Sequence, residues 1–204
     1  MTGPARPRDA ASLVVVRGAG QSLRVLMGRR APRHRFMPDV WVFPGGGVEH
    51  GDHHRPLLRP LRRAVARPLE QRWSPARVRA LAIAAVRETW EETGLAVGDV
   101  RGGQFLPDLA PLRYLGRAIT PAQSEIRYHA RFFVTDAGAA RGRLRGNGEL
   151  MDLSWLPIAM ARRLPIIDVT EEVLDRVARV HGERRRSRSF FIHYRLGERC
   201  IDDE

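Results

Sequence analysis

The chain alternates short apolar stretches with turn residues, and this pattern predicts more strands than helices. Runs rich in β-branched and aromatic residues, bounded by Gly, Pro, Asn or Asp, are typical of strands. Such runs are Ser12–Arg17, Leu23–Arg30, Trp41–Pro44, Leu112–Ile119, Arg127–Thr135, Leu150–Leu156 and Ser189–Arg195. Because the helices are few and well separated, we expect an α+β fold in which helices pack on a mixed sheet.

Two helices are marked by the residues at their ends. The first follows Ser74, a favourable N-cap residue that precedes a proline, and it ends at Gly94. The second is expected over Val169–His181, where Asp168 and Glu171 have the spacing of a capping box and a glycine follows.

The order of these elements predicts a single domain over residues 12–204. Residues 1–11 are rich in Pro and Arg, and we expect a loose N-terminal arm there. Residues 53–73 contain many arginines and proline breaks. They are expected to form an inserted, mostly surface segment with one or two helical turns.

The end of the first helix carries three glutamates in the stretch RETWEETGL. At 100° per residue, Glu91 and Glu92 lie within about 60° of Glu88, whereas Ile83 and Trp90 fall on the opposite side. Carboxylates four residues apart repel each other, and beside a core a cation would relieve this repulsion. Hard oxygen ligands suit Mg²⁺ or Mn²⁺, so the glutamates predict a divalent-metal platform. The alternative is a solvated acidic face at a helix end.

A glycine-dense loop, FPGGGVEHGD at residues 43–52, precedes this helix. Glycines allow a close approach of the backbone to a ligand and leave carbonyl groups free to coordinate a metal. The loop and the glutamates together resemble the Nudix box, whose pattern is G-x5-E-x7-R-E-U-x-E-E-x-G-U, with U a bulky apolar residue. Gly46 matches the first glycine. The second half is matched without a gap by Arg87, Glu88, Glu91, Glu92, Gly94 and Leu95.

The chain departs from this pattern in two ways. Asp52 stands where the pattern has Glu, and 34 residues, 53–86, separate it from Arg87 where the pattern has seven. Such an interrupted box resembles the peroxisomal-type coenzyme A diphosphatases and their bacterial look-alikes, and Ile119–Val134 is also similar to that branch. The resemblance extends over roughly residues 12–165. It predicts a Nudix-type mixed sheet packed between helices, with an insertion inside the box.

The resemblance implies hydrolysis of a nucleoside diphosphate linked to another moiety, such as coenzyme A or an acyl-CoA, with Mg²⁺ or Mn²⁺. Glu88 and Glu92 are implied to be the main metal ligands, Glu91 to assist them, and the backbone carbonyl near Gly46 to add a ligand. Arg87 is implied to orient the glutamates through its planar guanidinium group.

A general base is often supplied from a later loop in this family, and Glu149 in GNGELMDLSW is the predicted catalytic residue. Asp152 is the alternative, and an ordinary loop carboxylate is a third interpretation. His129 and His193 lie in strand-like runs, where a packing role is the more common one. The histidines next to the box lack the spacing of a preformed zinc site: His50, His53 and His54.

Four arginines precede the box and are expected to bind phosphate groups of the substrate: Arg29, Arg30, Arg33 and Arg35. Ordinary surface charge is the alternative for all four. An adenine ring could stack on Phe36, Trp41 or Tyr128, although aromatic residues near strands are more often part of a core.

The net charge of +12 raises the question of nucleic-acid binding. All basic residues are arginine, which indicates a coding bias more than a selected phosphate-binding surface. A nucleic-acid-facing Nudix protein acting on RNA 5′ ends remains an alternative, with Arg184–Arg188 as its densest basic cluster. A non-catalytic nucleotide sensor is the other alternative, although a sensor has no need of the full set of glutamates.

The chain has one cysteine, Cys200, which excludes an internal disulfide and a cysteine metal cluster. The apolar runs are too short to cross a bilayer, and the first residues lack the apolar region of a signal peptide. We therefore expect a cytoplasmic protein whose partner is a small molecule, without membrane contact. The oligomeric state stays open.

Overall fold

A mixed β-sheet forms the centre of the structure, a computed structural model that describes residues 5–33, 37–182 and 188–204. Nine strands of the described residues join in the order β11-β10-β7-β8-β1-β2-β3, with β4 paired to β1 and β9 paired to β2. The pairs β1–β8 and β7–β10 run parallel, and the other pairs run antiparallel. These strands are β1 (Arg8–Arg17), β2 (Arg24–Arg30), β3 (Trp41–Val42), β4 (Gly45–Gly47), β7 (Arg113–Ile119), β8 (Tyr128–Asp136), β9 (Leu150–Pro157), β10 (Phe190–Arg195) and β11 (Glu198–Asp203).

Each predicted strand has a counterpart, but β1 begins four residues earlier than expected. The prediction of a loose arm is therefore wrong for residues 8–11. Ala10 and Ala11 are buried, and they pair with β8 on one side and β4 on the other. Sequence reasoning missed the hairpin of β5 (Gly98–Arg101) and β6 (Gln104–Pro107), and also β11. All three strands are short, and β5 and β11 are largely exposed, whereas β6 buries Phe105.

The predicted first helix is α2 (Pro75–Thr93), and both of its ends are as expected. The Ser74 hydroxyl accepts a hydrogen bond from the Arg77 N–H at 3.3 Å. Gly94 has φ of 73°, the left-handed conformation that glycine adopts without strain, and its N–H donates to the Trp90 carbonyl at 2.8 Å. These two ends fix the glutamates in the last turns of a regular helix.

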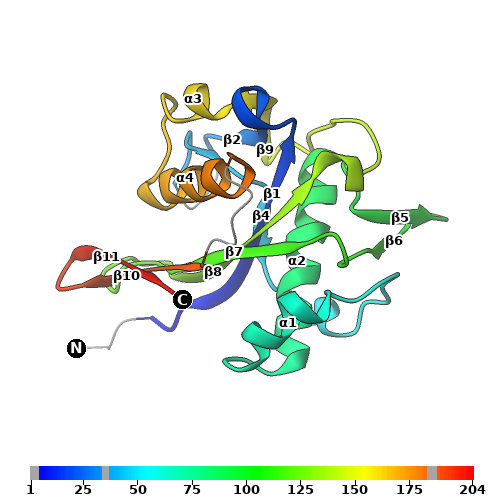
Figure 1. Cartoon of the computed structure of the whole chain (residues 1–204), viewed down its shortest axis with the longest axis horizontal. Helices are drawn as coiled ribbons and strands as arrows, with labels where there is room; N and C mark the ends of the chain where they lie inside the picture. The colour runs from blue at the N-terminus through cyan, green and yellow to red at the C-terminus, as the bar shows by residue number, and fades with distance from the viewer. Residues whose placement is uncertain (1–4, 34–36, 183–187) are drawn as a thin grey trace.

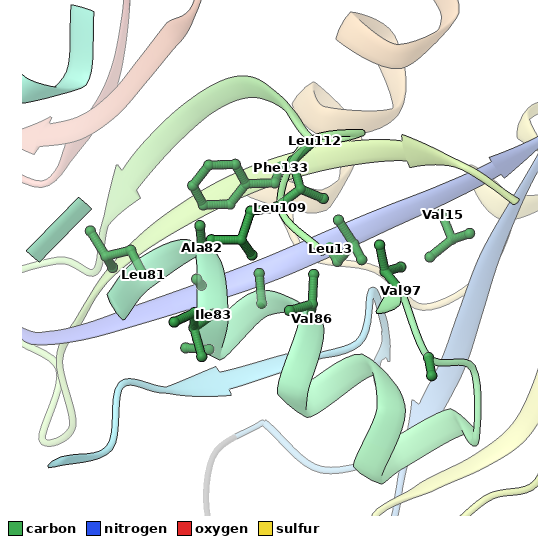
Figure 2. Packing of buried hydrophobic residues seen from close by; sticks show 14 of the residues in the cluster. Leu13, Val15, Leu81, Ala82, Ile83, Val86, Val97, Leu109, Leu112 and Phe133 are labelled. Carbon is green, nitrogen blue, oxygen red and sulfur yellow. The ribbon is translucent and has the colours of Figure 1, made fainter. Parts of the chain in front are cut away.

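The sheet lies between α2 and α4 (Asp168–Gly182), which cover its opposite faces (Figure 1). One apolar cluster joins α2 to the sheet; Leu13 and Val15 of β1 meet Ile83 and Val86 of the helix (Figure 2). A second cluster joins the other face of β1 to α4. This alternation along β1 follows from the two-residue period of a strand. The predicted α+β fold with a sheet between helices is confirmed.

The segment 53–73 is more closely attached to the core than the sequence predicted. It contains α1 (Arg63–Glu70), whose Leu69 is 4% exposed and belongs to the cluster under α2. The ring of Trp73 lies 4.6 Å from the guanidinium carbon of Arg131, a fully buried residue of β8. The segment is thus mostly at the surface, as expected, but Leu69 and Trp73 of its second half join it to the core.

The start of α4 differs from the predicted capping box. Asp168 is the first helical residue, and its carboxylate accepts hydrogen bonds from the Val169 N–H at 2.8 Å and the Tyr194 hydroxyl at 2.7 Å. The Glu171 N–H donates instead to the carbonyl of Ile167. A short helix, α3 (Ile158–Ala161), comes before α4. The side chain of Asp168 thus serves a contact between α4 and β10.

The predicted basic cluster can be located only in part. Of the basic cluster Arg184–Arg188, residues 184–187 lie outside the described residues. None of the helices in the described ranges combines the length and the apolar character that a membrane-crossing segment requires.

Candidate active site

The predicted box loop folds into β4 followed by a short 3₁₀ turn at residues 50–53. β4 pairs with the start of β1 and faces the C-terminal half of α2. A Cβ atom at Gly46 would overlap the carboxylate of Glu88, and one at Gly45 would overlap Ser12. Glycine is therefore required for the loop to lie against the helix and the sheet at the same time.

The buried guanidinium group of Arg87 holds this site together. Its Nε and Nη2 donate to the two carboxylate oxygens of Asp52, at 2.9 and 3.1 Å. Nη2 also donates to the Gly47 carbonyl at 2.9 Å, and Nη1 donates to Glu88 at 2.9 Å and Glu91 at 3.0 Å. Burial alone would lower the pKa of Arg87, but the hydrogen bonds to Asp52 and the surrounding carboxylates outweigh it and raise this pKa. Arg87 is therefore a permanent cation that fixes the box loop to α2.

Glu88 and Glu92 lie in surroundings that exclude much of the solvent, and the charge of Glu88 acts on Glu92. Burial, partly offset by Arg87, raises the pKa of Glu88 to about 6. Burial also raises the pKa of Glu92 to about 8, and the Gly45 N–H, which donates to Glu92 Oε2 at 2.9 Å, offsets this only in part. The charges of Glu88 and Glu149 raise it further. A cation beside Glu88 and Glu92 would favour the ionised form of both carboxylates.

The donor atoms fit a divalent metal ion in their chemistry and charge. Carboxylate oxygens and the carbonyl groups of a glycine loop are hard ligands of the kind that Mg²⁺ and Mn²⁺ prefer. Glu88 Oε1 accepts a hydrogen bond from Arg87, and Glu92 Oε2 accepts one from the Gly45 N–H. Each carboxylate therefore keeps a second oxygen that can bind a ligand. The described residues contain no ready-made group of three His, Cys, Asp or Glu side chains at metal-binding distance. A cation would therefore have to draw the glutamates closer together.

A cavity of about 340 Å³ opens beside these glutamates. Gly45–Gly47, Glu88 and Glu92 form one end of its lining, and Glu149 lies at the same end. Glu149 is exposed and follows the loop that leads into β9. Its backbone is held by hydrogen bonds to Asn147 and Ala31, at 2.9 and 3.0 Å. The cavity has the size of a small-molecule site, and solvent reaches its acidic end.

Comparisons with known proteins identify the fold. No protein-family model and no curated protein matches the chain. A NUDIX hydrolase from Alicyclobacillus acidocaldarius is 28% identical, over 88% of this chain and 94% of that chain, with a TM-score of 0.67. The NUDIX domain of Shewanella oneidensis NrtR, solved with ADP ribose, is 14% identical over 85% of this chain and 87% of that chain, with a TM-score of 0.50. A C. elegans Ap4A hydrolase is 14% identical over 85% of this chain and 96% of that chain, with a TM-score of 0.51.

This chain has the Nudix hydrolase fold. The two structures at 14% identity show the fold alone, whereas the Alicyclobacillus protein supports the predicted enzyme class, a Nudix pyrophosphohydrolase. Nudix hydrolases generally use divalent metal ions, and the carboxylates around Arg87 agree with such a requirement. The roles of the individual residues, and Mg²⁺ or Mn²⁺ as the ion, remain predictions.

The structure separates the four arginines that were expected to bind phosphates. Arg30 lines the cavity of the Nudix site, near Glu92. Arg29 forms ion pairs with Asp39 and Asp152, at 2.7 and 2.8 Å, and does not line the cavity. Arg33 lies near Gly148, also outside the lining, and Arg35 lies outside the described residues. Of the three arginines in the described residues, Arg30 alone therefore lines the cavity.

Asp152 and the histidines lie away from the Nudix cavity. Asp152 is held by Arg29 and does not line the cavity, which favours Glu149 among the two predicted bases. His129 packs beside Trp73, and its Nε2 lies 3.2 Å from Arg117 Nη1. His193 pairs with Asp202 at 2.9 Å. His50, His53 and His54 contact each other through their rings and form no metal site with other described residues.

Aromatic and polar residues from distant parts of the chain complete the cavity. Tyr128, one of the predicted stacking residues, lines it, whereas Trp41 does not and Phe36 lies outside the described residues. Sequence reasoning missed Asp168 and Tyr194, which line its other end. Asp168 was recognisable as the start of a helix, but nothing in the sequence near Tyr194 signals that β10 returns to this helix.

Proposed function

We propose that the chain hydrolyses the diphosphate bond of a nucleoside diphosphate linked to another moiety, with Mg²⁺ or Mn²⁺ bound at the Nudix box. The observation that carries this proposal is the convergence of Glu88, Glu92 and Glu149 on one cavity, next to the glycine loop. A diphosphate is a polyanion, and a cluster of carboxylates can accept it only when cations lie between them.

Glu88 and Glu92 would hold the metal, with Glu91 and the backbone carbonyl near Gly46 as further ligands. Bound there, the cation would neutralise charge on the leaving phosphate oxygen and lower the pKa of a bound water. Arg87 does not line the cavity and contacts the glutamates instead. Its part is to keep the carboxylates in position, not to bind phosphate.

Glu149 is the proposed general base. It lines the cavity at the end where Glu88 and Glu92 lie, and its exposed position gives water access to it. A base in this place can take the proton of a water that attacks a phosphorus atom held between the metal site and the cavity. Arg30, half-buried near Glu92, would contact a phosphate oxygen of the bound substrate.

Different observations support the nucleotide part of the substrate and the moiety joined to it. The NrtR domain was solved with ADP ribose and the C. elegans protein is an Ap4A hydrolase, so two proteins of this fold act on or bind nucleotides. They support a nucleoside diphosphate derivative as the class. Coenzyme A and acyl-CoA enter through the resemblance of the interrupted box to coenzyme A diphosphatases.

The RNA alternative is less well supported. In the part of the chain that the structure describes, ten arginines form ion pairs, among them Arg59, Arg77, Arg117, Arg131 and Arg176. A paired arginine contributes less to the counterion release that drives RNA binding.

A substrate panel tests the proposal. The chain is incubated with ADP-ribose, NADH, diadenosine polyphosphates, coenzyme A, dNTPs and capped RNA, each with Mg²⁺, with Mn²⁺ or with excess EDTA, and products are identified by mass spectrometry. We expect at least one diphosphate to be split, and only when a divalent metal is present. Both products should keep a phosphate. Undiminished hydrolysis in EDTA, or no hydrolysis of any substrate, would contradict the proposal.

A further inference from the structure

Strand β9 carries a bulge near its start, where it pairs with β2. The register of the two strands shifts by one residue between Met27 and Arg29. Residues 152 and 153 of β9 therefore lie opposite Gly28 alone. A Cβ atom on Gly28 would lie 2.9 Å from the side chain of Leu150, so the close approach of the strands at the bulge requires glycine.

The bulge decides how the residues before it meet the Nudix cavity. Glu149 and Leu150 precede it, and both line the cavity. A register shift of one residue moves a strand by about 3.3 Å and turns its side chains to the opposite face. The position of Glu149, at the end of the cavity where Glu88 and Glu92 lie, therefore depends on the bulge.

The backbone on both sides of the cavity adopts a conformation that few residues other than glycine accept. Asp152, in the bulge, has φ of 55°, where bulges of this geometry mostly have glycine. Met37 and Asp39, in the segment before β3, have φ of 50° and 60°, and Met37 lines the same cavity. Such residues persist only where their surroundings hold them, and they gather at functional sites.

The guanidinium group of Arg29 joins these two segments. Its Nε donates to Asp152 Oδ2 at 2.8 Å, and its Nη1 donates to Asp39 Oδ1 at 2.7 Å. Two residues further along the chain, the Ala31 N–H donates to the Glu149 carbonyl at 3.0 Å. Arg29 itself does not line the cavity, so it contacts the loop of Glu149 from the outside.

We propose that Arg29 is a positioning residue, which fixes the bulge of β9 through Asp152 and thereby places Glu149 in the cavity as the general base. The inference rests on the proposed function, in which Glu149 takes the proton of the attacking water. An exposed ion pair contributes little to the stability of a protein. A catalytic group displaced by about 1 Å, however, can lose about 100-fold in rate. The contacts of Arg29 therefore matter more for kcat than for stability.

A double-mutant cycle tests this role on the diphosphate that the substrate panel identifies. Arg29→Gln should lower kcat about tenfold and change KM less than about threefold, because the lining of the cavity is kept. In a Glu149→Gln background the same change should lower kcat less than about twofold, because the base that it would displace is already absent. Arg24→Gln is the matched control and should leave kcat unchanged. Arg24 lies on the same strand and donates to the Trp155 carbonyl of β9 at 3.4 Å, beyond the bulge.

The substitution Asp152→Gly provides a rescue, because glycine adopts the left-handed conformation of the bulge without strain. Arg29→Gln combined with Asp152→Gly should recover kcat to within about threefold of the unmodified chain. Arg29→Gln combined with Asp152→Ala is the control and should not recover it, because alanine disfavours this conformation.

Amide hydrogen exchange measured by NMR follows the same geometry without any substrate. Exchange of the Ala31 N–H, which donates to the Glu149 carbonyl, should be at least about fivefold faster in Arg29→Gln than in the unmodified chain. Arg24→Gln should leave it unchanged.

Undiminished kcat in Arg29→Gln would overturn the inference, and so would an equal loss of kcat with and without the Glu149 carboxylate. The absence of recovery with Asp152→Gly would show that Arg29 does not act through the bulge, which also overturns it. If the panel shows no hydrolysis, the proposed function fails by itself. Exchange at Ala31 then decides whether Arg29 positions the loop of Glu149, and an unchanged rate in Arg29→Gln rejects that role.

Discussion

Arg87 and Asp52 are joined by two parallel hydrogen bonds, of 2.9 and 3.1 Å, although 34 residues separate them in the chain. Both side chains are almost completely buried. The pair fixes the glycine loop to α2 at the point where the segment 53–73 leaves the box. An inserted segment between the two halves of the box is therefore compatible with an intact arrangement of the glutamates.

Removing one partner of this pair should destabilise the protein strongly. Asp52→Ala leaves the buried Arg87 with two unpaired donors, and we expect the free energy of unfolding to fall by about 3–5 kcal/mol. Urea denaturation followed by circular dichroism measures the change. Glu49→Ala is the matched control, because Glu49 is exposed and 3.8 Å from the same guanidinium group. It should cost less than about 1 kcal/mol. Equal losses in the two variants would show that the Asp52 pair has no special weight.

Neutralising Glu92 should remove activity without unfolding the protein. Glu92→Gln keeps the shape and the acceptor for the Gly45 N–H while it removes a buried charge. We expect kcat to fall about 100-fold or more on whichever diphosphate the panel identifies, because a metal-binding charge is lost. The thermal midpoint should stay the same or rise. Glu70→Gln, an exposed residue of α1, serves as the control. Full turnover by Glu92→Gln would show that Glu92 is not a metal ligand.

The two halves of the segment 53–73 should respond differently to truncation. Leu69→Ala removes a side chain that is 4% exposed, and we expect a loss of about 2–3 kcal/mol in the free energy of unfolding. Leu58→Ala, in the same segment but 43% exposed, should change it by less than about 1 kcal/mol. The measurement is again chemical denaturation. A similar small effect in both variants would restore the view that the whole segment is a surface addition.

The half-buried histidine of β8, His129, should make the protein sensitive to acid. Burial, and then the charges of Arg131 and Arg117, lower the pKa of His129 to about 3 from its ordinary value of 6.5; Arg77 acts in the same direction, and Asp9 opposes them. Between these two values the unfolded chain binds a proton that the folded chain does not. Stability therefore falls as the pH drops below about 6.5, by at most about 1.4 kcal/mol per pH unit for this group.

His129→Gln should flatten this dependence between pH 6.5 and 5, and thermal unfolding at several pH values measures it. The residue is only partly buried, so solvent will reduce the slope below its limit. His193→Gln, on the hairpin of β10 and β11, is the matched control and should leave the slope unchanged. If both variants show the same pH dependence of stability as the unmodified chain, His129 has no part in the acid response.

The sequence determined the parts of this protein that depend on neighbours along the chain. Ser74, Gly94 and the 3.6-residue period were sufficient for α2 and for the shared face of Glu88, Glu91 and Glu92. The resemblance of the box residues to the Nudix pattern predicted the enzyme class, and the two-residue period predicted most strands. Each of these signals acts within a few residues, where backbone geometry leaves few choices.

The tertiary structure decided everything that depends on residues meeting across the chain. It separated Arg30 from Arg29, because a strand turns successive side chains to opposite faces and only one of them met the cavity. It brought Tyr194 to Asp168 through the parallel pairing of β10 with β7, which no local pattern encodes. It also buried Leu69 in a segment whose composition is that of a surface. In each case the outcome depends on long-range packing, and packing is set by which surfaces of the whole chain can be buried together.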